Sequence, residues 1–276
     1  MDFRASHQRM KHFLPILLFA LAAIAQTTPP TAPAIPMDQQ NANKARALID
    51  QAIEALGGNA YLNIEDMTQE GRGYSFHHGE PSGAGGLFWR FYRFPDRERI
   101  ELTKKRDIAY VYRGDEGFEI TYKGVRSDEP KAVTDFVRRR KYSLEWVLRK
   151  WLHEPGIALF YDGPAVAAQK DTQQVTLVNS RNESVDLYFD TSSHLPVKKS
   201  FSWRDPTDKE RNIEEDIYDN YRPVEGVMTP FSVTHFYNGD MASQRFLNSI
   251  RYNTGLNDSL FNVNVTYDPN KAAPRK

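Results

Sequence analysis

The chain has 276 residues and no cysteine, and its 36 lysines and arginines balance its 36 aspartates and glutamates. This balance gives no electrostatic argument for a nucleic-acid partner, and the missing cysteine excludes disulfides, thiol catalysis and a lipid-modified cysteine. The content of 16 Phe, 14 Tyr and 4 Trp favours a sheet-rich fold.

The N-terminal segment has the features of a secretory signal peptide. Basic residues precede a short apolar run, residues 13–25, which ends in an A-x-A cleavage sequence. An uncleaved anchor is the weaker alternative, because the run is short for a membrane span. We therefore expect a signal peptide over residues 1–25, a flexible Pro/Thr-rich leader over residues 26–40 and a periplasmic protein without a further membrane-spanning segment.

A first helix is predicted to follow the leader. Asn41 or Asn43 can cap its start, and Gly57-Gly58 can end it. Its apolar residues recur at helical spacing and form one face: Ala45, Leu48, Ile49, Ala52, Ile53 and Leu56. We expect this face to pack against another element.

Alternating apolar residues then predict strands over residues 86–102 and 108–124, after an exposed glycine-rich loop at residues 79–86. The stretch from Leu87 to Phe94 carries large apolar side chains on both faces, which is unusual for a strand with one solvated face. Either helices and loops cover both faces, or one aromatic face lines a ligand cavity.

Residues 131–152 predict one long helix, or two helices with a break near Arg140. The basic run at residues 138–141 is typical of a solvated helix face. The sharper alternative is contact with anionic lipid head groups through Arg138, Arg139 and Arg140, because basic amphipathic helices bind membrane surfaces.

Six further strands are predicted at residues 175–179, 185–190, 196–203, 213–218, 230–237 and 245–252. Asn238-Gly239 predicts a type I′ hairpin between the last two. The acidic cluster at residues 212–216 lacks the spacing of a calcium loop, so we expect it at an exposed strand edge.

The order of elements predicts an α+β fold. Short turns between strands favour antiparallel pairing, and two helices cannot cover both faces of so large a sheet. We expect a strongly curved antiparallel sheet with helices packed on its concave side, in a single domain over residues 41–268 that precedes a disordered tail at residues 269–276.

Motifs with the spacing of a known mechanism are missing from the sequence, and we expect no catalytic residue, metal or cofactor. A hydrolase that uses scattered His and Asp/Glu residues remains an alternative. Its candidates are His77, His153, His194 and His235. His235 shares a strand face with apolar neighbours, and we interpret it as a hydrogen-bonded core histidine rather than a polar spot in a lipid cavity.

Short motifs across residues 44–265 are similar to one family. They are AIEALGG, FPDRERIEL, GDEGFEI, DTSSHLPVKKSFSW, IYDNYRPVEGVMTPFSVTHF and LFNVNV. On these motifs the chain resembles the LolA/LolB-like superfamily of envelope proteins, often labelled outer-membrane lipoprotein-sorting proteins. The resemblance implies an incomplete β-barrel with helices as a lid and an apolar cavity that binds acyl chains. The leader, the glycine-rich loop and the basic central helix depart from the pattern.

Together these observations predict a soluble, non-catalytic periplasmic carrier of lipid or lipoprotein acyl chains, monomeric, with envelope membrane proteins as a further class of partner. An interaction module without a small ligand is the other alternative. The residues expected to line the cavity are aromatic or aliphatic: Phe88, Tyr110, Phe118, Trp146, Trp151, Phe231 and Val233.

Overall fold

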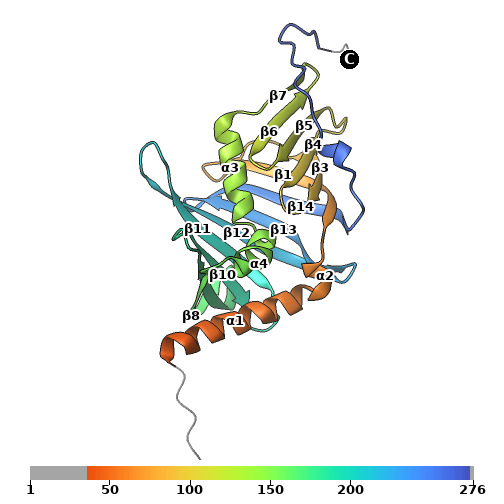
Figure 1. Cartoon of the computed structure of the whole chain (residues 1–276). Coiled ribbons are helices and arrows are strands. Elements are labelled where there is room, and N and C mark those ends of the chain that lie inside the picture. Colours follow the sequence, from red (N-terminus) through yellow and green to blue (C-terminus); the bar gives the residue numbers. More distant parts are fainter. Residues whose placement is uncertain (1–35, 274–276) are drawn as a thin grey trace, which may run out of the picture. The chain divides into compact units, whose positions relative to one another are not determined.

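The structure, a computed structural model, describes residues 36–273, so the predicted signal peptide lies outside the described residues. Within this range one antiparallel sheet contains fourteen strands (Figure 1). They are β1 (Asp66–His77), β2 (Glu80–Pro81), β3 (Gly86–Arg93), β4 (Arg97–Leu102), β5 (Ile108–Arg113), β6 (Glu116–Thr121), β7 (Gly124–Ser127), β8 (Ala158–Ala167), β9 (Lys170–Val178), β10 (Ser184–Asp190), β11 (Pro196–Arg204), β12 (Arg211–Val224), β13 (Val227–Tyr237) and β14 (Asp240–Tyr252).

The helices divide this series of strands into two groups. They are α1 (Met37–Leu56), α2 (Asn59–Leu62), α3 (Pro130–Lys141), α4 (Leu144–Arg149) and the short 3₁₀ helices η1 (Trp151–His153) and η2 (Asp258–Phe261). α3, α4 and η1 separate β1–β7 from β8–β14. None of the helices in residues 36–273 has both the length and the hydropathy of a membrane span.

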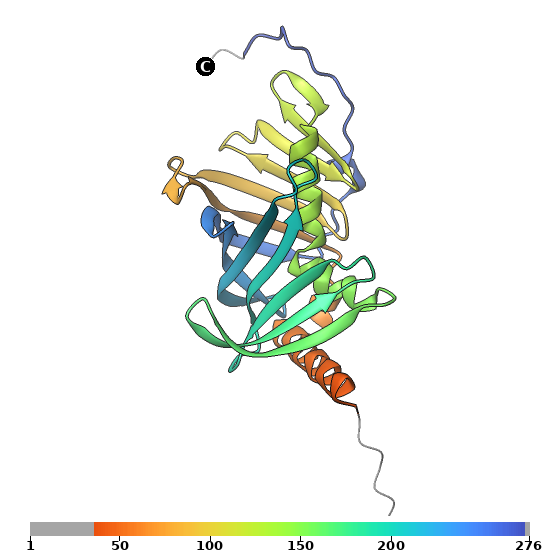
Figure 2. The ribbon, with the colours of Figure 1, turned by 90° about the vertical axis from the view of Figure 1, so that its left-hand side faces the viewer.

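The strand order explains why the sheet stays open. Its order is β7-β6-β5-β4-β3-β1-β14-β13-β12-β11-β10-β9-β8, with β2 off this path and paired to β1, so the two groups join only through the β1–β14 pair. The chain leaves one edge at β7 and returns at the other edge, β8, through α3 and α4. This segment therefore spans the open side of the curved sheet, as Figure 2 shows. The predicted incomplete barrel is confirmed.

One apolar core lies between the helices and the sheet. α1 contributes Ala45, Ile49, Ala52, Ile53 and Leu56, all from the predicted face, and α4 contributes Leu144, Val147 and Leu148. The sheet contributes buried residues from β9, β10 and β13. The prediction that the helices pack on the concave side is confirmed.

α3 approaches the other half of the sheet closely at β5 and β6. The Tyr112 and Phe136 rings stack with centroids 3.6 Å apart, so the even-numbered residues of β5 face α3. Gly117 lies beneath Val133, and a Cβ at this position would come within 2.6 Å of the valine methyl carbon. A glycine at this position therefore lets the helix lie on the strand.

The opposite face of the same strands has its own apolar contact. Val111 pairs with Phe118, and both are buried on the side away from α3. η2 packs against β4 and β5 on the outside and contributes the fully buried Phe261. Both faces are thus covered here, which explains the apolar residues on both sides of these strands.

Several sequence-based boundaries differ from the structure. α1 begins at Met37, so the last residues of the predicted leader are helical, and neither predicted asparagine caps it. Asn41 instead exchanges hydrogen bonds of 2.8 Å with the backbone of Tyr161 and ties α1 to the β8 edge. The central helix divides as the second alternative predicted, and the Ser143 side chain caps α4 by accepting from the Trp146 amide.

The acidic cluster at residues 212–216 does not lie at an exposed edge, and this prediction is wrong. β12 is an interior strand, hydrogen-bonded to β11 on one side and β13 on the other. Glu214 is fully buried. Tertiary ion pairs, described below, make this burial possible.

Candidate functional site

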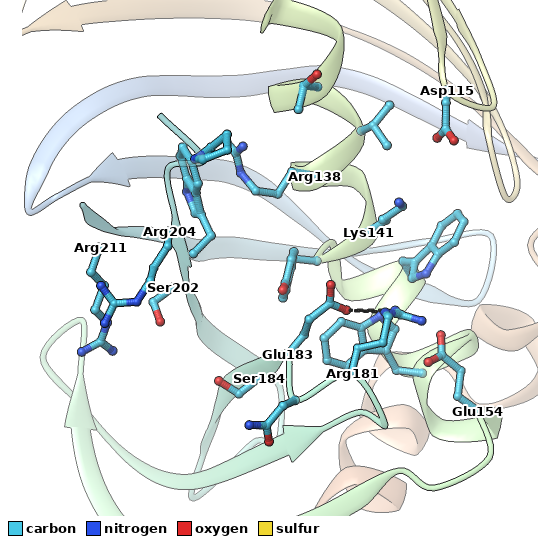
Figure 3. A pocket seen from close by; sticks show the side chains of 18 of the residues that line it. Asp115, Arg138, Lys141, Glu154, Arg181, Glu183, Ser184, Ser202, Arg204 and Arg211 are labelled. Atoms are coloured by element: carbon cyan, nitrogen blue, oxygen red, sulfur yellow. Dashed lines mark hydrogen bonds and ion pairs between the residues drawn. The ribbon is translucent and has the colours of Figure 1, made fainter. Parts of the chain in front are cut away.

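A groove with a volume of about 1200 Å³ lies between α3 and the ends of strands β10–β12 (Figure 3). We call it the α3 groove. Side chains of α3, α4 and η1 form one wall. The β9–β10 turn, the end of β11 and the start of β12 form the other. The residues that line it include Val133, Val137, Arg138, Lys141, Tyr142, Trp146, Trp151, Arg181, Glu183, Ser184, Ser202, Trp203, Arg204 and Arg211.

Aromatic side chains give the groove a rigid apolar wall. Tyr142 follows α3 and stacks on Phe201 of β11, with ring centroids 4.0 Å apart, and its other neighbour is Trp151 at 5.2 Å. Burial raises the pKa of Tyr142 to about 12, so its phenol stays neutral near neutral pH. Trp146, partly buried against the core, continues this wall.

Trp203 is fixed on the opposite side by a buried ion pair. The Arg138 guanidinium lies over its indole ring at 3.4 Å from the centroid. Glu214, beneath both, accepts hydrogen bonds from Trp203 Nε1 at 2.9 Å and from Arg138 Nη2 at 3.1 Å. A single carboxylate therefore positions one cationic and one aromatic side chain of the groove.

The basic run at residues 138–141 is not a solvated face, and that prediction is wrong for two of its members. Arg138 is 15% exposed in its ion pairs with Asp135 and Glu214. Arg140 is 7% exposed. Its guanidinium donates to the carbonyls of Asp96 at 3.1 Å and Gly114 at 2.6 Å, which ties α3 to two turns of the sheet.

The groove also contains a neutralised pair at its floor. Arg181 donates to Glu183 at 2.9 Å across the β9–β10 turn. Burial opposes ionisation of Glu183, but hydrogen bonds from Asn179 and Arg181 outweigh it and lower the pKa of the carboxyl. Glu183 is therefore anionic and neutralises the charge of Arg181.

The structure brings together some of the predicted site residues and separates others. Trp146, Trp151 and Arg138 line the α3 groove. Phe231 and Val233 belong to the same buried core as Trp151 but not to the groove wall.

The remaining predicted residues lie in the other half of the sheet. Phe88 is buried on β3, and Tyr110 lies on the α3 side of β5, where its hydroxyl donates to Glu119 at 3.4 Å. Phe118 faces away from α3. Arg139, 45% exposed, lies 3.8 Å from Glu214.

Sequence reasoning missed Trp203 and the two arginines at the strand ends, Arg204 and Arg211. Their place in the groove depends on segments far apart in the chain, as the contact between Trp203 and Arg138 shows. The sequence feature that could have indicated these residues was the clustering of Trp and Arg at the end of a predicted strand.

A row of polar residues crosses the sheet beneath α3. Ser243, His235, Asp216 and Lys199 stand in register on neighbouring strands β14, β13, β12 and β11. His235 Nδ1 lies 2.8 Å from Asp216, and its Nε2 lies 3.5 Å from Glu214.

His235 is thus held between two carboxylates, as expected for a hydrogen-bonded histidine within the fold. In the described region no hydrogen bond joins Ser243 to His235, so the row does not have the nucleophile–base geometry of a hydrolase. Nor do residues 36–273 place three or more His, Asp or Glu side chains so that they could hold a metal ion.

The described residues thus form an open antiparallel sheet spanned by helices, with a groove beneath the central helix. No family model and no curated protein matches the chain. Solved structures do. A DUF1329 family protein from Desulfovibrio piger is 14% identical with a TM-score of 0.55.

Two further structures have the same fold. An outer membrane lipoprotein-sorting protein domain from Vibrio parahaemolyticus is 13% identical with a TM-score of 0.54, and a LolA superfamily protein from Nitrosomonas europaea is 12% identical with a TM-score of 0.50. Each of the three matches covers 79% of this chain and 97% of the other. The distant resemblance to LolA-like proteins is confirmed at the level of the fold.

Proposed function

We propose that the protein binds lipid or lipoprotein acyl chains in the α3 groove, as a non-catalytic carrier exported to the periplasm. The observation that carries this proposal is the aromatic wall formed by Tyr142, Trp146 and Trp151 beside a groove of about 1200 Å³. Burying an acyl chain there would contribute roughly 0.8 kcal/mol per methylene group. The fold shared with a lipoprotein-sorting protein domain supports the same class of ligand.

The proposed binding surface includes fewer residues than the surface predicted from the sequence. Of the predicted cavity residues we assign acyl-chain contact to Trp146, which is partly exposed in the groove, while Trp151 is 1% exposed and supports the wall from behind. Of the predicted basic contacts we retain Arg138 at the rim. Export rests on the signal-peptide features of residues 1–25.

The test is a titration of the purified protein with a fluorescent fatty acid. Trp146→Ala removes one side of the groove wall, and we expect the affinity to fall roughly 10- to 150-fold because roughly 1.5–3 kcal/mol of apolar contact is lost. Trp89→Ala is the matched control. Trp89 lies on β3 beneath the Arg106 guanidinium, outside the groove.

Uptake by the wild type and by Trp89→Ala, with weaker uptake by Trp146→Ala, supports the proposal. Thermal unfolding of both variants checks that they are folded. Equal loss in the two variants would contradict the assignment of the groove, and no uptake by the wild type would contradict lipid binding itself.

A further inference from the structure

Two arginines stand opposite each other where the α3 groove reaches the strand ends. Arg204 ends β11, Arg211 begins β12, and the two residues pair in register. Residues directly opposite in an antiparallel pair place their side chains on the same face, a few ångströms apart. Like charges in this position are destabilising, so a nearby negative charge would stabilise the pair.

No ion pair within the described residues supplies that counter-charge. Arg204 donates to the Lys209 carbonyl at 3.1 Å, and no carboxylate of residues 36–273 lies within 4.0 Å of either guanidinium. Asp186, on the neighbouring strand β10, accepts a hydrogen bond from Thr176, and Arg211 acts on this carboxyl at longer range. Both arginines are exposed and available to a ligand.

The other arginines of the groove are already compensated. Arg138 is paired with the buried Glu214, and Arg181 with Glu183. The cations of the groove without an ion pair in the described residues are therefore Lys141, Arg204 and Arg211. Two of the three lie together at the Arg204–Arg211 end, which Figure 3 shows at the side of the groove away from Glu154.

The surroundings of this pair suit an oxyanion. Ser202 lies two residues before Arg204 on the same face of β11, and Ser184 lines the groove from β10. Guanidinium groups bind phosphate and carboxylate oxygens through paired hydrogen bonds, and hydroxyl groups add further donors. Trp203 precedes Arg204 in the chain and faces α3, so the end of β11 carries an apolar side chain on one face and a cationic one on the other.

We propose that Arg204 and Arg211 bind the anionic head group of a lipid whose acyl chain lies along the aromatic wall of the α3 groove. The ligand is an amphiphile with a phosphate or carboxylate head group. This inference rests on the proposed acyl-chain function and adds selectivity for the charge of the head group.

The experiment compares two lysolipids with the same acyl chain by calorimetric titration below their micelle concentrations. Lysophosphatidylglycerol has a net negative head group, and lysophosphatidylcholine is zwitterionic. We expect the wild type to bind the anionic lysolipid at least about tenfold more tightly, because charge-assisted hydrogen bonds are the strong ones. The preference should weaken as the salt concentration rises.

The double variant Arg204→Gln/Arg211→Gln should lose this preference and keep its affinity for lysophosphatidylcholine. The matched control is Arg72→Gln/Arg251→Gln, which removes the same charge from exposed positions on β1 and β14 outside the groove. The control variant should keep the preference.

The outcomes separate this inference from the proposed function. Equal binding of both lysolipids by the wild type overturns the head-group site and leaves acyl-chain binding standing. Binding of neither overturns both. Inorganic phosphate is the third probe. If it displaces lysophosphatidylglycerol at comparable concentrations, the arginines form a free-phosphate site, and the assignment to a lipid head group is overturned.

Discussion

Glu214 makes contacts on which the position of α3 depends. Its side chain is fully buried, and Oε1 accepts from both Arg138 and Trp203, while Oε2 faces His235 at 3.5 Å and Arg139 at 3.8 Å. An ion pair of this kind is costly to break, because the remaining partner is left with an uncompensated charge. The carboxylate therefore couples the sheet to the helix that borders the groove.

We expect Glu214→Ala to lower the free energy of unfolding by about 3–5 kcal/mol. The measurement is urea unfolding of the variant beside the wild type. Glu215→Ala is the control on the same strand. Glu215 pairs with Lys198, both side chains are about a quarter exposed, and the expected loss is about 0–1 kcal/mol. Equal losses in the two variants would show that Glu214 does not hold α3.

Asp216 makes the stability of the protein depend on pH. Burial opposes its ionisation, but the Lys199 ammonium and the His235 ring outweigh burial and hold the pKa of this carboxyl well below its usual range. Since the pKa in the unfolded chain is about 4, the carboxylate stabilises the fold above about pH 4. That contribution is lost as the pH falls towards the folded-state pKa.

Asp216→Asn should therefore be less stable than the wild type by about 1.5–3 kcal/mol near neutral pH. The difference should shrink as the pH falls below about 4, because the carboxyl of the unfolded wild-type chain then takes up a proton while the folded one stays ionised, which favours unfolding. Urea midpoints over this pH range measure it. A difference that stays constant down to strongly acidic pH would contradict the role given to this carboxylate.

At the residue scale, the sequence predicted which apolar side chains share a face, but it did not predict that charged side chains would be buried. The cluster at residues 212–216 and the run at residues 138–141 both have the composition of a solvated surface. Each is buried in part because the other supplies the opposite charge, through Arg138 and Glu214. Such pairing across 76 residues leaves no local pattern in the sequence.

The β13–β14 hairpin has the turn that Asn238-Gly239 predicted. Both residues have positive φ, 50° and 88°, as a type I′ turn requires. We expect Gly239→Ala to lower the unfolding free energy by roughly 1–2 kcal/mol, because a Cβ is unfavourable in this conformation. No atom lies within 4 Å of the position where the Cβ would be, so backbone strain alone causes the loss.

Gly86→Ala is the control for this substitution. Gly86 begins β3, has no positive φ and is equally open. Its variant should match the wild type or be slightly more stable, since alanine loses less conformational freedom on folding. Thermal unfolding of the two variants compares them, and equal midpoints would contradict the turn assignment.

At the element scale, prediction succeeded where periodicity was regular. The six strands predicted in the C-terminal half are all present, and the helix break falls close to Arg140. β8 was missed because a bulge between Tyr161 and Gly163 interrupts its alternation, and Gly163-Pro164 imitates a turn. A bulge of this kind is set by its partner strand, here β9.

The arrangement of the whole described region follows from one long-range pair. β1 and β14 join the two groups of strands, and α3 and α4 cross from edge strand β7 to edge strand β8. Short turns predicted antiparallel neighbours correctly, but the β1–β14 pairing has no local signal. The same holds for the α3 groove, whose walls come from segments that meet only in the folded chain.

The most direct test of lipid binding is native mass spectrometry of the protein purified from its own host. We predict a fraction that carries an additional mass. Denaturation should release it, and extraction should identify it as an acylated amphiphile. Trp146→Ala prepared in the same way should carry less of it. Wild-type protein that is consistently empty, and that takes up no fluorescent fatty acid, would contradict the proposal that the α3 groove binds acyl chains.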